Sequence, residues 1–204
     1  VLSYVDPYAS SACEMVTEMI QYVDDGIKLK AFEADALYAG ISIDTDGFNS
    51  KSGPRTFEAA AFLRRHGADV TRVRKMLRND MDEYKAIASA VSKAEVYKDA
   101  FAITIFDGAG LESPTIGGAK AANQLLDISG IKASFVITAY NNIIYISARS
   151  IDEVNVQTIM EKLGGGGHMN VAGAQLRNVT LGEARSMLKD VLMAQEEKGD
   201  EVKG

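Results

Sequence analysis

The sequence predicts an α/β protein made of two lobes. Apolar residues after Ser11 repeat at helical spacing, whereas Leu37 to Ile43 is an almost uninterrupted apolar run of strand length. Further along, strand-like segments occur at Phe101 to Phe106, Phe135 to Tyr140 and Ile143 to Ala148, with helix signals between and after them. Because the 204 residues exceed one average domain, we expect two lobes to share these elements.

The first lobe is predicted to combine helices with a strand of a parallel sheet. Ser11 to Glu14 has the S-x-x-E form of a capping box and opens the first helix. The run from Leu37 to Ile43 suits a strand that is covered on both faces, and Asp44 follows it directly. Ligands collect at the carboxyl ends of the strands in such sheets, so the pattern places Asp44 where a metal ligand would lie.

Helix signals continue through the middle of the chain. Pro54 suits the first turn of a second helix and Gly67 suits its end, while a third helix opens at Asp69. The segment from Asp80 to Lys93 carries apolar residues in helical register. We expect this last helix to link the two lobes.

The second lobe is predicted as strands interleaved with helices. Its last two expected strands meet at Asn141-Asn142, a dipeptide that tolerates the positive φ angles of a tight hairpin. Helices are expected over Gly117 to Leu126 and, behind a second capping box that begins at Ser150, over Ile151 to Leu163. A final helix opens at Thr180 in another capping box and runs into a charged tail.

The most informative segment for function is GGGGHMNVAG, which begins at Gly164. Residues without a Cβ let a ligand lie against backbone amides, and His168 adds a hydrogen-bonding ring directly after them. The segment matches neither the P-loop nor the dinucleotide-binding glycine pattern. Two interpretations of the run itself stay open, a phosphate cradle and a flexible hinge. His168 and Asn170, together with Arg149 ahead of the run, favour the cradle.

An anion site at this loop would draw on two segments. Arg149 and Ser150 end a predicted strand, and the loop with His168 follows the next predicted helix, so both can converge on one phosphate. The alternative for Arg149 is an ion pair with Asp152 or Glu153. The candidate substrate-binding residues are Arg149, Ser150, Asn155, Gly165, Gly166, Gly167, His168 and Asn170.

Composition narrows the class of partner. A formal net charge of −6 argues against binding of long nucleic acids, which relies on many cations, but it allows a small nucleotide. A single cysteine, Cys13, excludes an internal disulfide and a cysteine-rich zinc site. No apolar run approaches the roughly 20 residues that a membrane-spanning helix needs.

Several segments resemble one superfamily. SARSIDEVNVQTIMEKLGGGGHMNVAGAQL, from Ser147 to Leu176, is similar to the DHH-associated domain of the DHH phosphoesterases, whose GGGH loop binds the phosphate of the substrate. Upstream, YVDPYASSACEMVTEMIQY, EADALYAGISIDTDGF and RTFEAAAFLRRHGAD look like the second half of the catalytic DHH domain. Together these spans most resemble the GdpP-type cyclic di-AMP phosphodiesterases of Gram-positive bacteria.

The chain also departs from the family pattern. The Asp-His-His motif and the other acidic metal-binding motifs of the family do not occur in it, and its only histidines are His66 and His168. Of the family's metal ligands, Asp44 in the GISIDT motif alone has a match, although a two-metal hydrolytic site needs several ligands. Since the sequence also begins with Val1, we expect it to be a fragment of a longer enzyme and to be inactive by itself.

The resemblance implies a plan for the whole chain. Residues 1–79 would be the C-terminal part of a DHH catalytic domain that contains a parallel sheet, 80–96 a linker helix, and 97–204 a smaller α/β DHH-associated domain with a charged tail. The expected enzyme is a hydrolase that uses two Mn²⁺ ions to open cyclic di-AMP to linear pApA. Alternatives are an oligonucleotide exonuclease of the same superfamily and a non-catalytic nucleotide-binding module.

The resemblance also carries expectations about partners and location. The partner would be a cyclic dinucleotide or a short oligonucleotide, and a homodimer is compatible with this plan. The chain would be a cytoplasmic domain without membrane contact of its own. The parent enzyme would be anchored in the cell membrane by an N-terminal part outside this sequence.

Overall fold

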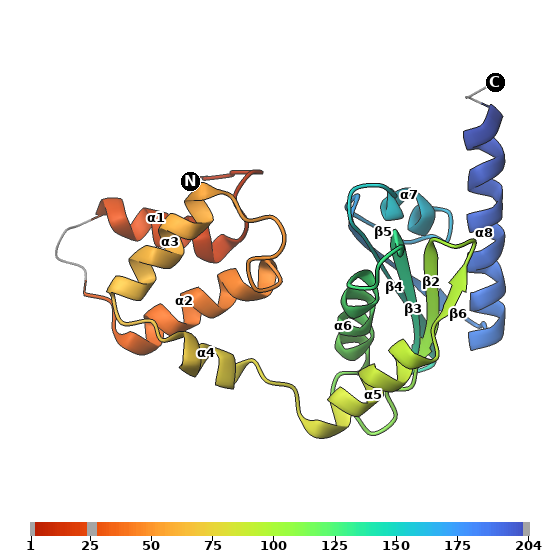
Figure 1. The fold of residues 1–204 in the computed structure, drawn as a ribbon, viewed down its shortest axis with the longest axis horizontal. Helices are drawn as coiled ribbons and strands as arrows, with labels where there is room; N and C mark the ends of the chain where they lie inside the picture. Colours follow the sequence, from red (N-terminus) through yellow and green to blue (C-terminus); the bar gives the residue numbers. More distant parts are fainter. Residues whose placement is uncertain (1–2, 24–27, 202–204) are drawn as a thin grey trace. The chain divides into compact units, whose positions relative to one another are not determined.

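The computed structural model describes residues 3–23 and 28–201, with side chains up to residue 194. The chain divides into two compact units, residues 1–78 and 79–204 (Figure 1). Each unit has its own core and is described by itself. The side chains of the predicted charged tail lie outside the described residues.

The first unit is helical throughout its described residues. Its helices are α1 (Ala12–Val23), α2 (Ala31–Asp44), α3 (Pro54–Arg65) and α4 (Val70–Met76). The predicted helix ends are confirmed: the Ser11 Oγ accepts from the Glu14 N–H at 3.0 Å, Gly67 has φ +97°, and Asp69 caps α4. The helices meet over a small cluster of buried side chains, Ala34, Ile41, Ala59, Leu63 and Ala68.

The predicted strand from Leu37 to Ile43 is wrong, because this segment is the second half of α2. Ala34, Ile41 and Thr45 are fully buried at helical spacing, so one side of the helix faces the core. A short apolar run fits a strand and a buried helix equally well, and only its continuation upstream separates the two. Asp44 is therefore the last residue of a helix, and the expected parallel sheet of the first lobe is not present in the residues described there.

The second unit contains a six-stranded sheet, which confirms the α/β class. The strands lie in the order β1-β2-β3-β4-β6-β5, where β2 and β3 are parallel and the other neighbours are antiparallel. Asn141 and Asn142 join β3 to β4 at positive φ, as predicted for the hairpin. The strand bounds are β1 (Glu95–Tyr97), β2 (Phe101–Phe106), β3 (Ala133–Tyr140), β4 (Ile143–Ser150), β5 (Gly166–Gly167) and β6 (Val171–Arg177).

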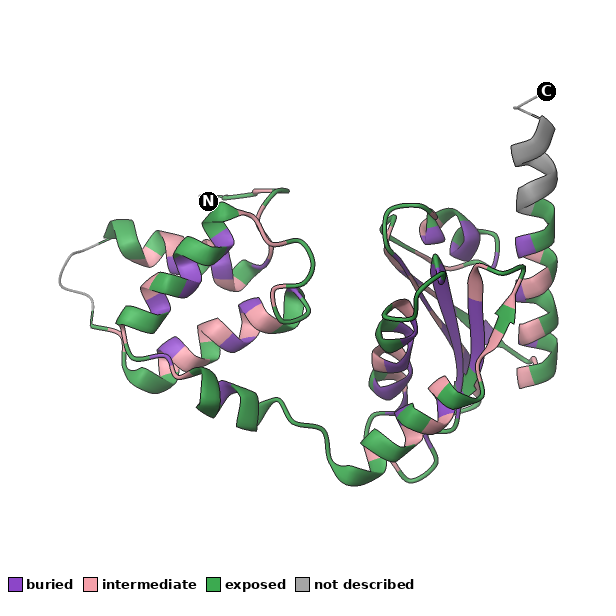
Figure 2. Ribbon diagram, in the orientation of Figure 1, coloured by how far each residue is buried: buried purple, intermediate pink, exposed green. Residues whose placement is uncertain are grey.

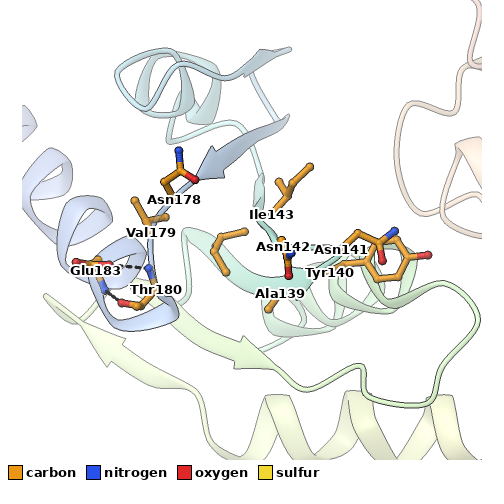
Figure 3. A pocket seen from close by; sticks show the side chains of 10 residues that line it. Ala139, Tyr140, Asn141, Asn142, Ile143, Asn178, Val179, Thr180 and Glu183 are labelled. Carbon is orange, nitrogen blue, oxygen red and sulfur yellow. Dashed lines mark hydrogen bonds between the residues drawn. The ribbon is translucent and has the colours of Figure 1, made fainter.

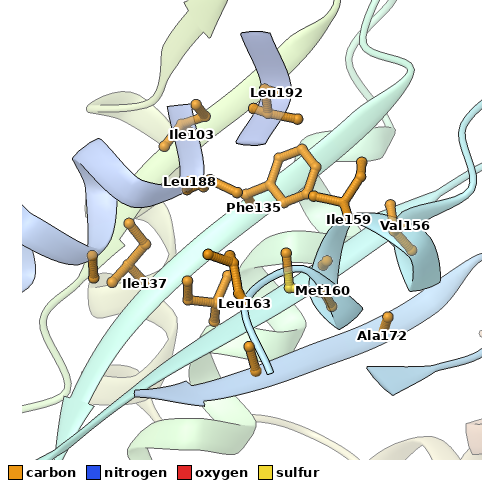
Figure 4. Packing of buried hydrophobic residues seen from close by; sticks show 14 of the residues in the cluster. Ile103, Phe135, Ile137, Val156, Ile159, Met160, Leu163, Ala172, Leu188 and Leu192 are labelled. Atoms are coloured by element: carbon orange, nitrogen blue, oxygen red, sulfur yellow. The ribbon is translucent and has the colours of Figure 1, made fainter. Parts of the chain in front are cut away.

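Helices cover both faces of this sheet. One face packs against α5 (Met81–Ser92) and α6 (Pro114–Leu126), and the other packs against α7 (Val156–Glu161) and α8 (Leu181–Glu201). The central strand β3 is buried at six successive positions for this reason (Figure 2). On the α7 and α8 side, Phe135 of β3 lies among Ile159 of α7 and Leu188 and Leu192 of α8 (Figure 4). The predicted helix at Asp80 to Lys93 is confirmed as α5, and it contacts α6 and β2 of this unit.

One prediction for the second unit needs correction, and the strand β6 was missed. The helix expected from Ile151 is wrong at its start, because Ser150 ends β4 and α7 begins only after Asn155, which caps it by accepting from the Thr158 N–H at 3.3 Å. The sequence also gave no prediction for β6, although Val171–Arg177 alternates buried and accessible residues. None of the helices in the described part of the chain is both long and apolar enough to cross a membrane.

Candidate functional site

The four glycines of the run Gly164 to Gly167 serve different structural purposes. Gly164 has φ +74° and ends α7, where its N–H donates to the Glu161 carbonyl at 3.0 Å. Gly165 lies against β6, and a Cβ there would be 2.1 Å from the Gly173 carbonyl oxygen. Gly167 has φ +146° and also packs against β6. These three positions require glycine for backbone reasons alone.

Gly166 differs from its three neighbours. A Cβ built on it would meet no atom within 4 Å, and its φ is not in the left-handed region. The fold therefore does not demand glycine at this position, whereas a ligand that approaches the backbone would. Gly166 and Gly167 pair with Gly173 and Ala172 as an edge strand, so the run is not an unpaired hinge.

Most amides around the run are already bonded within the chain. The Gly165 N–H donates to the Met160 carbonyl at 2.8 Å, and the His168 N–H donates to the Val171 carbonyl at 2.8 Å. Because the Gly164 N–H is also bonded, fewer successive amides are left to bind a phosphate than the sequence suggested. What remains of it is the open side of Gly166.

Backbone pairing brings Arg149 of β4 and His168, the residue after β5, to the same face of the sheet. Arg149 of β4 pairs with Val171 of β6, and Val171 exchanges backbone hydrogen bonds with His168 at 2.8 and 3.2 Å. Residues paired across antiparallel strands point to the same face, and here it is the face that α6 covers in part. The next row on that face is Ser147, Gly173 and Gly166. A guanidinium and an imidazole thus lie on either side of Val171, next to a row in which Gly173 and Gly166 have no side chain.

Arg149 is half-buried and is held from α6. Its Nε donates to the Asn123 Oδ1 at 3.0 Å, and its Nη1 donates to the Ala148 carbonyl at 2.9 Å. Burial lowers the pKa of the Arg149 guanidinium from its ordinary value, although an arginine stays charged at neutral pH. Desolvation of this kind increases the attraction of a charge for an incoming anion.

The alternative partners of Arg149 are occupied elsewhere. Glu153 forms an ion pair with Lys132 at 2.8 Å, and Asp152 accepts from the Asn170 Nδ2 at 3.0 Å. Within the described residues, no carboxylate lies within ion-pair distance of Arg149. The interpretation of Arg149 as a partner of Asp152 or Glu153 is therefore wrong.

Three of the predicted site residues make hydrogen bonds in and around the loop that contains His168. Ser150 is buried, and its N–H donates to the Asn170 carbonyl at 3.0 Å. Asn155 caps α7, and the Val156 N–H donates to the Met169 carbonyl at 2.9 Å. Asn170 turns its amide nitrogen to Asp152, and its Oδ1 is buried without a partner among the described residues. The structure brings these residues close to His168, where their hydrogen bonds hold the backbone of the loop.

Comparison with known proteins gives this site a family. A family model described as the DHHA1 domain matches residues 116–195, which contain β4, the glycine run and β6. The matched residues lie in the second unit. The resemblance to the DHH phosphoesterases predicted from the sequence is thereby confirmed.

Relatives of known activity match nearly the whole chain. The cyclic-di-AMP phosphodiesterase GdpP of Geobacillus thermodenitrificans is 44% identical over 193 residues, which cover 94% of this chain and 29% of that protein. The cyclic-di-AMP phosphodiesterase PdeA of Listeria monocytogenes is 43% identical over 189 residues, which cover 92% of this chain and 29% of that protein. The chain therefore spans less than a third of the length of these relatives.

A solved structure supports the fold. An exopolyphosphatase-related protein from Bacteroides fragilis has a TM-score of 0.83 at 22% identity, covering 95% of this chain and 59% of that one. At this identity the likeness concerns the fold alone.

The second unit also contains residues near the glycine run that the sequence did not single out. A hollow beside the glycine run is lined by Thr115 of α6, by Tyr145 and Ser147 of β4, and by Gln175 of β6, together with Gly164 to Gly166. The polar residues at every second position of β4, Tyr145, Ser147 and Arg149, were a readable signal of one accessible strand face. No sequence pattern indicated the hydrogen bond between Asn123 and Arg149, because it depends on how α6 packs on the sheet.

A second hollow of this unit lies at the other end of β4 (Figure 3). Its polar residues already have structural tasks. The Glu183 carboxylate accepts from the Thr180 N–H at 2.6 Å and the Thr180 Oγ1 accepts from the Glu183 N–H at 3.2 Å, which starts α8. Asn141 and Asn142 form the hairpin turn. The hollow beside the glycine run is the better candidate for ligand binding.

Asp44 lies in the first unit and does not complete a metal site. It is exposed at the end of α2, and no three His, Cys, Asp or Glu side chains among the described residues are placed to hold a metal ion. Burial, and secondarily the charge of Asp44, raise the pKa of the Cys13 thiol, which fits an unreactive cysteine. The residues described here thus do not by themselves fit a two-manganese centre.

Proposed function

We propose that this chain is the substrate-binding portion of a phosphodiesterase that hydrolyses cyclic di-AMP to linear pApA. Support comes from the DHHA1 domain and from the 44% and 43% identity to the relatives GdpP and PdeA, whose names state this activity. The chemistry proposed for this chain is recognition of one phosphoryl group of the dinucleotide.

The observation that carries the proposal is the row of Arg149, Val171 and His168 beside the open side of Gly166. The planar guanidinium of Arg149 matches phosphate oxygens and supplies charge. Gly166 leaves room for those oxygens against the backbone, and the exposed His168 ring donates a hydrogen bond to them. Ser150, Asn155 and Asn170 hold this loop in place.

Manganese enters the proposal only through Asp44. We propose that Asp44 is one ligand of a two-metal site whose other ligands belong to the full-length enzyme. Bound metal ions would supply an activated water and would neutralise charge on the phosphorane. Because the described residues do not form such a site, no step of the reaction is assigned to this chain alone.

A titration tests the proposal. The chain should bind cyclic di-AMP and pApA more tightly than longer oligoadenylates, and it should not turn them over with manganese present. Arg149→Ala should weaken binding by about 1.5 to 3 kcal/mol, roughly ten- to hundredfold, because a charge-assisted contact is lost. Arg177→Ala is the matched control, since this exposed arginine of β6 pairs with Ile143 at the other end of the sheet.

Equal binding by Arg149→Ala and the unchanged chain would contradict the assigned phosphate site. A clear preference for oligoadenylates would favour the exonuclease class of the superfamily. Turnover by the purified chain that survives repurification would contradict its role as a binding portion only.

A further inference from the structure

Asn123 holds the side chain of Arg149 from a different element. It lies on α6, and its Oδ1 accepts from the Arg149 Nε at 3.0 Å. The Ala148 carbonyl accepts from the Arg149 Nη1 at 2.9 Å. Two contacts on different nitrogens fix both the position and the plane of the guanidinium, because the group is rigid. Arg149 is therefore oriented before any ligand arrives.

Both partners of Arg149 are neutral, which sets it apart from Arg55, Arg72 and Arg185. Arg55 pairs with Glu18, Arg72 with Asp35, and Arg185 with Glu95. These carboxylates raise the pKa of Arg55 and Arg72, whereas burial lowers the pKa of Arg149. Arg149 is thus held by its hydrogen bonds, while its charge is not neutralised by a described carboxylate.

The contacts leave donors for a ligand. A guanidinium has five N–H groups, and the bonds to Asn123 and Ala148 use one on Nε and one on Nη1. Three N–H groups remain on the side chain. Arg149, which carries these N–H groups, lies on the same face of the sheet as His168 and the open side of Gly166.

We propose that Asn123 is a positioning residue that orients Arg149 toward a phosphoryl group of the nucleotide through a neutral acceptor. This inference rests on the proposed function, since it takes Arg149 as the phosphate ligand. An amide oxygen holds the Nε less strongly than a carboxylate would, but it leaves the positive charge free for the phosphate. A carboxylate at position 123 would compete with the ligand for the same guanidinium.

Three substitutions of Asn123 separate the effect of orientation from that of charge, measured by calorimetric titration of the 204-residue chain with pApA. Asn123→Ala removes the acceptor and should weaken binding about fivefold, the typical effect of one hydrogen bond. Asn123→Asp keeps an acceptor but pairs with Arg149, so it should weaken binding further, and more strongly at low salt. Asn123→Gln keeps the amide and should retain more affinity than Asn123→Ala.

Gln124 offers matched controls. It follows Asn123 on α6, is exposed, and its side chain has no hydrogen bond among the described residues. Gln124→Ala and Gln124→Asp introduce the same residues one position away and should stay within about twofold of the unchanged chain. An equal loss in Gln124→Asp and Asn123→Asp would overturn the inference, because the effect would then be one of net charge.

A double-mutant cycle tests whether Asn123 acts through Arg149. In a chain that already carries Arg149→Ala, Asn123→Ala should cause no further loss of affinity. The NMR signal of the Arg149 Nε–H should also lose its protection from exchange in Asn123→Ala, with or without ligand. An unchanged Nε–H signal, or an Asn123→Ala loss that persists without Arg149, would overturn the inference and leave the proposed function standing. If Arg149→Ala itself binds normally, the proposed function fails first.

Discussion

The two units of this chain are stabilised in different ways. The second buries large side chains on both faces of its sheet, including Phe135 and Leu188, whereas three of the five residues in the core cluster of the first are alanines. Both units also carry surface ion pairs, such as that of Arg55 with Glu18 in the first and that of Lys132 with Glu153 in the second. Burial of a large apolar side chain contributes about 1.5 to 3 kcal/mol, whereas an exposed ion pair contributes about 0 to 1.

The difference shows which unit can hold a ligand rigidly. Arg149 and Gly166 lie on strands of a sheet that is packed on both sides, and His168 directly follows β5 and bonds to Val171 of β6, so their spacing is set by backbone hydrogen bonds. Asp44 lies at the exposed end of a helix in the weaker unit. We therefore expect the second unit to govern affinity and the first to matter for turnover in the full-length enzyme.

The largest expected effects are on the stability of the two units. The contrast between the units predicts that each substitution destabilises only the unit that contains it. Phe135→Ala should lower the free energy of unfolding of the second unit by about 3 to 5 kcal/mol, and Leu63→Ala should lower that of the first by about 2 to 4. Calorimetric melting should show two transitions, the first unit melting earlier, with each substitution shifting only its own. A single transition shifted by both would mean that the units unfold as one.

Asp44 gives the next largest effect, on catalysis. In the full-length enzyme, Asp44→Asn should reduce manganese-dependent hydrolysis by orders of magnitude and lower the bound metal, because a carboxylate ligand is lost. Binding of pApA by the chain itself should not change. Asp46→Asn is the control, since asparagine tolerates the φ of +49° at that position. Normal metal content and turnover in Asp44→Asn would contradict the assignment.

A pair of glycine substitutions sharpens the assignment of the second unit to binding. Gly166→Val enters open space, so the melting temperature should stay nearly constant while affinity for pApA falls by roughly tenfold or more, equivalent to about 1.4 kcal/mol. Gly165→Val would place its Cβ against the Gly173 carbonyl and should instead destabilise the unit. Unchanged affinity in Gly166→Val would show that no ligand uses this surface.

The smallest effect expected is on acid stability. Lys189 and Arg185 hold the pKa of Glu95 below its ordinary value of 4.5, so the stability they confer is present above that pH and is lost as the pH falls through the lower folded-state pKa. Glu95→Gln should cost about 0.5 to 1 kcal/mol at neutral pH and flatten the acid limb of the second transition. Asp35→Asn, which removes the partner of Arg72, should alter only the first transition. An unchanged acid limb in Glu95→Gln would contradict the prediction.

Local signals predicted the elements whose form depends on nearby residues. The strands at Phe101, Phe135 and Ile143, the hairpin at Asn141-Asn142 and the capping box at Thr180 all follow from alternation, turn chemistry and caps. The helix expected behind Ser150 shows the limit of such signals. The S-x-x-E pattern from Ser150 occurs at the end of β4 and does not begin a helix. The Ser150 N–H instead donates to the Asn170 carbonyl.

The sequence by itself determined the α/β class, the helix and hairpin ends, and the place of the phosphate-binding candidates around Arg149 and His168. Tertiary structure alone decided that Leu37 to Ile43 is helical, since a short apolar run satisfies either period until its neighbours and partners are known. It also decided that Gly166 is the glycine of its run that neither a positive φ nor a neighbouring atom requires, and that Asn123 accepts a hydrogen bond from Arg149. Both depend on contacts between segments far apart in the chain, and no local pattern of residues records such contacts.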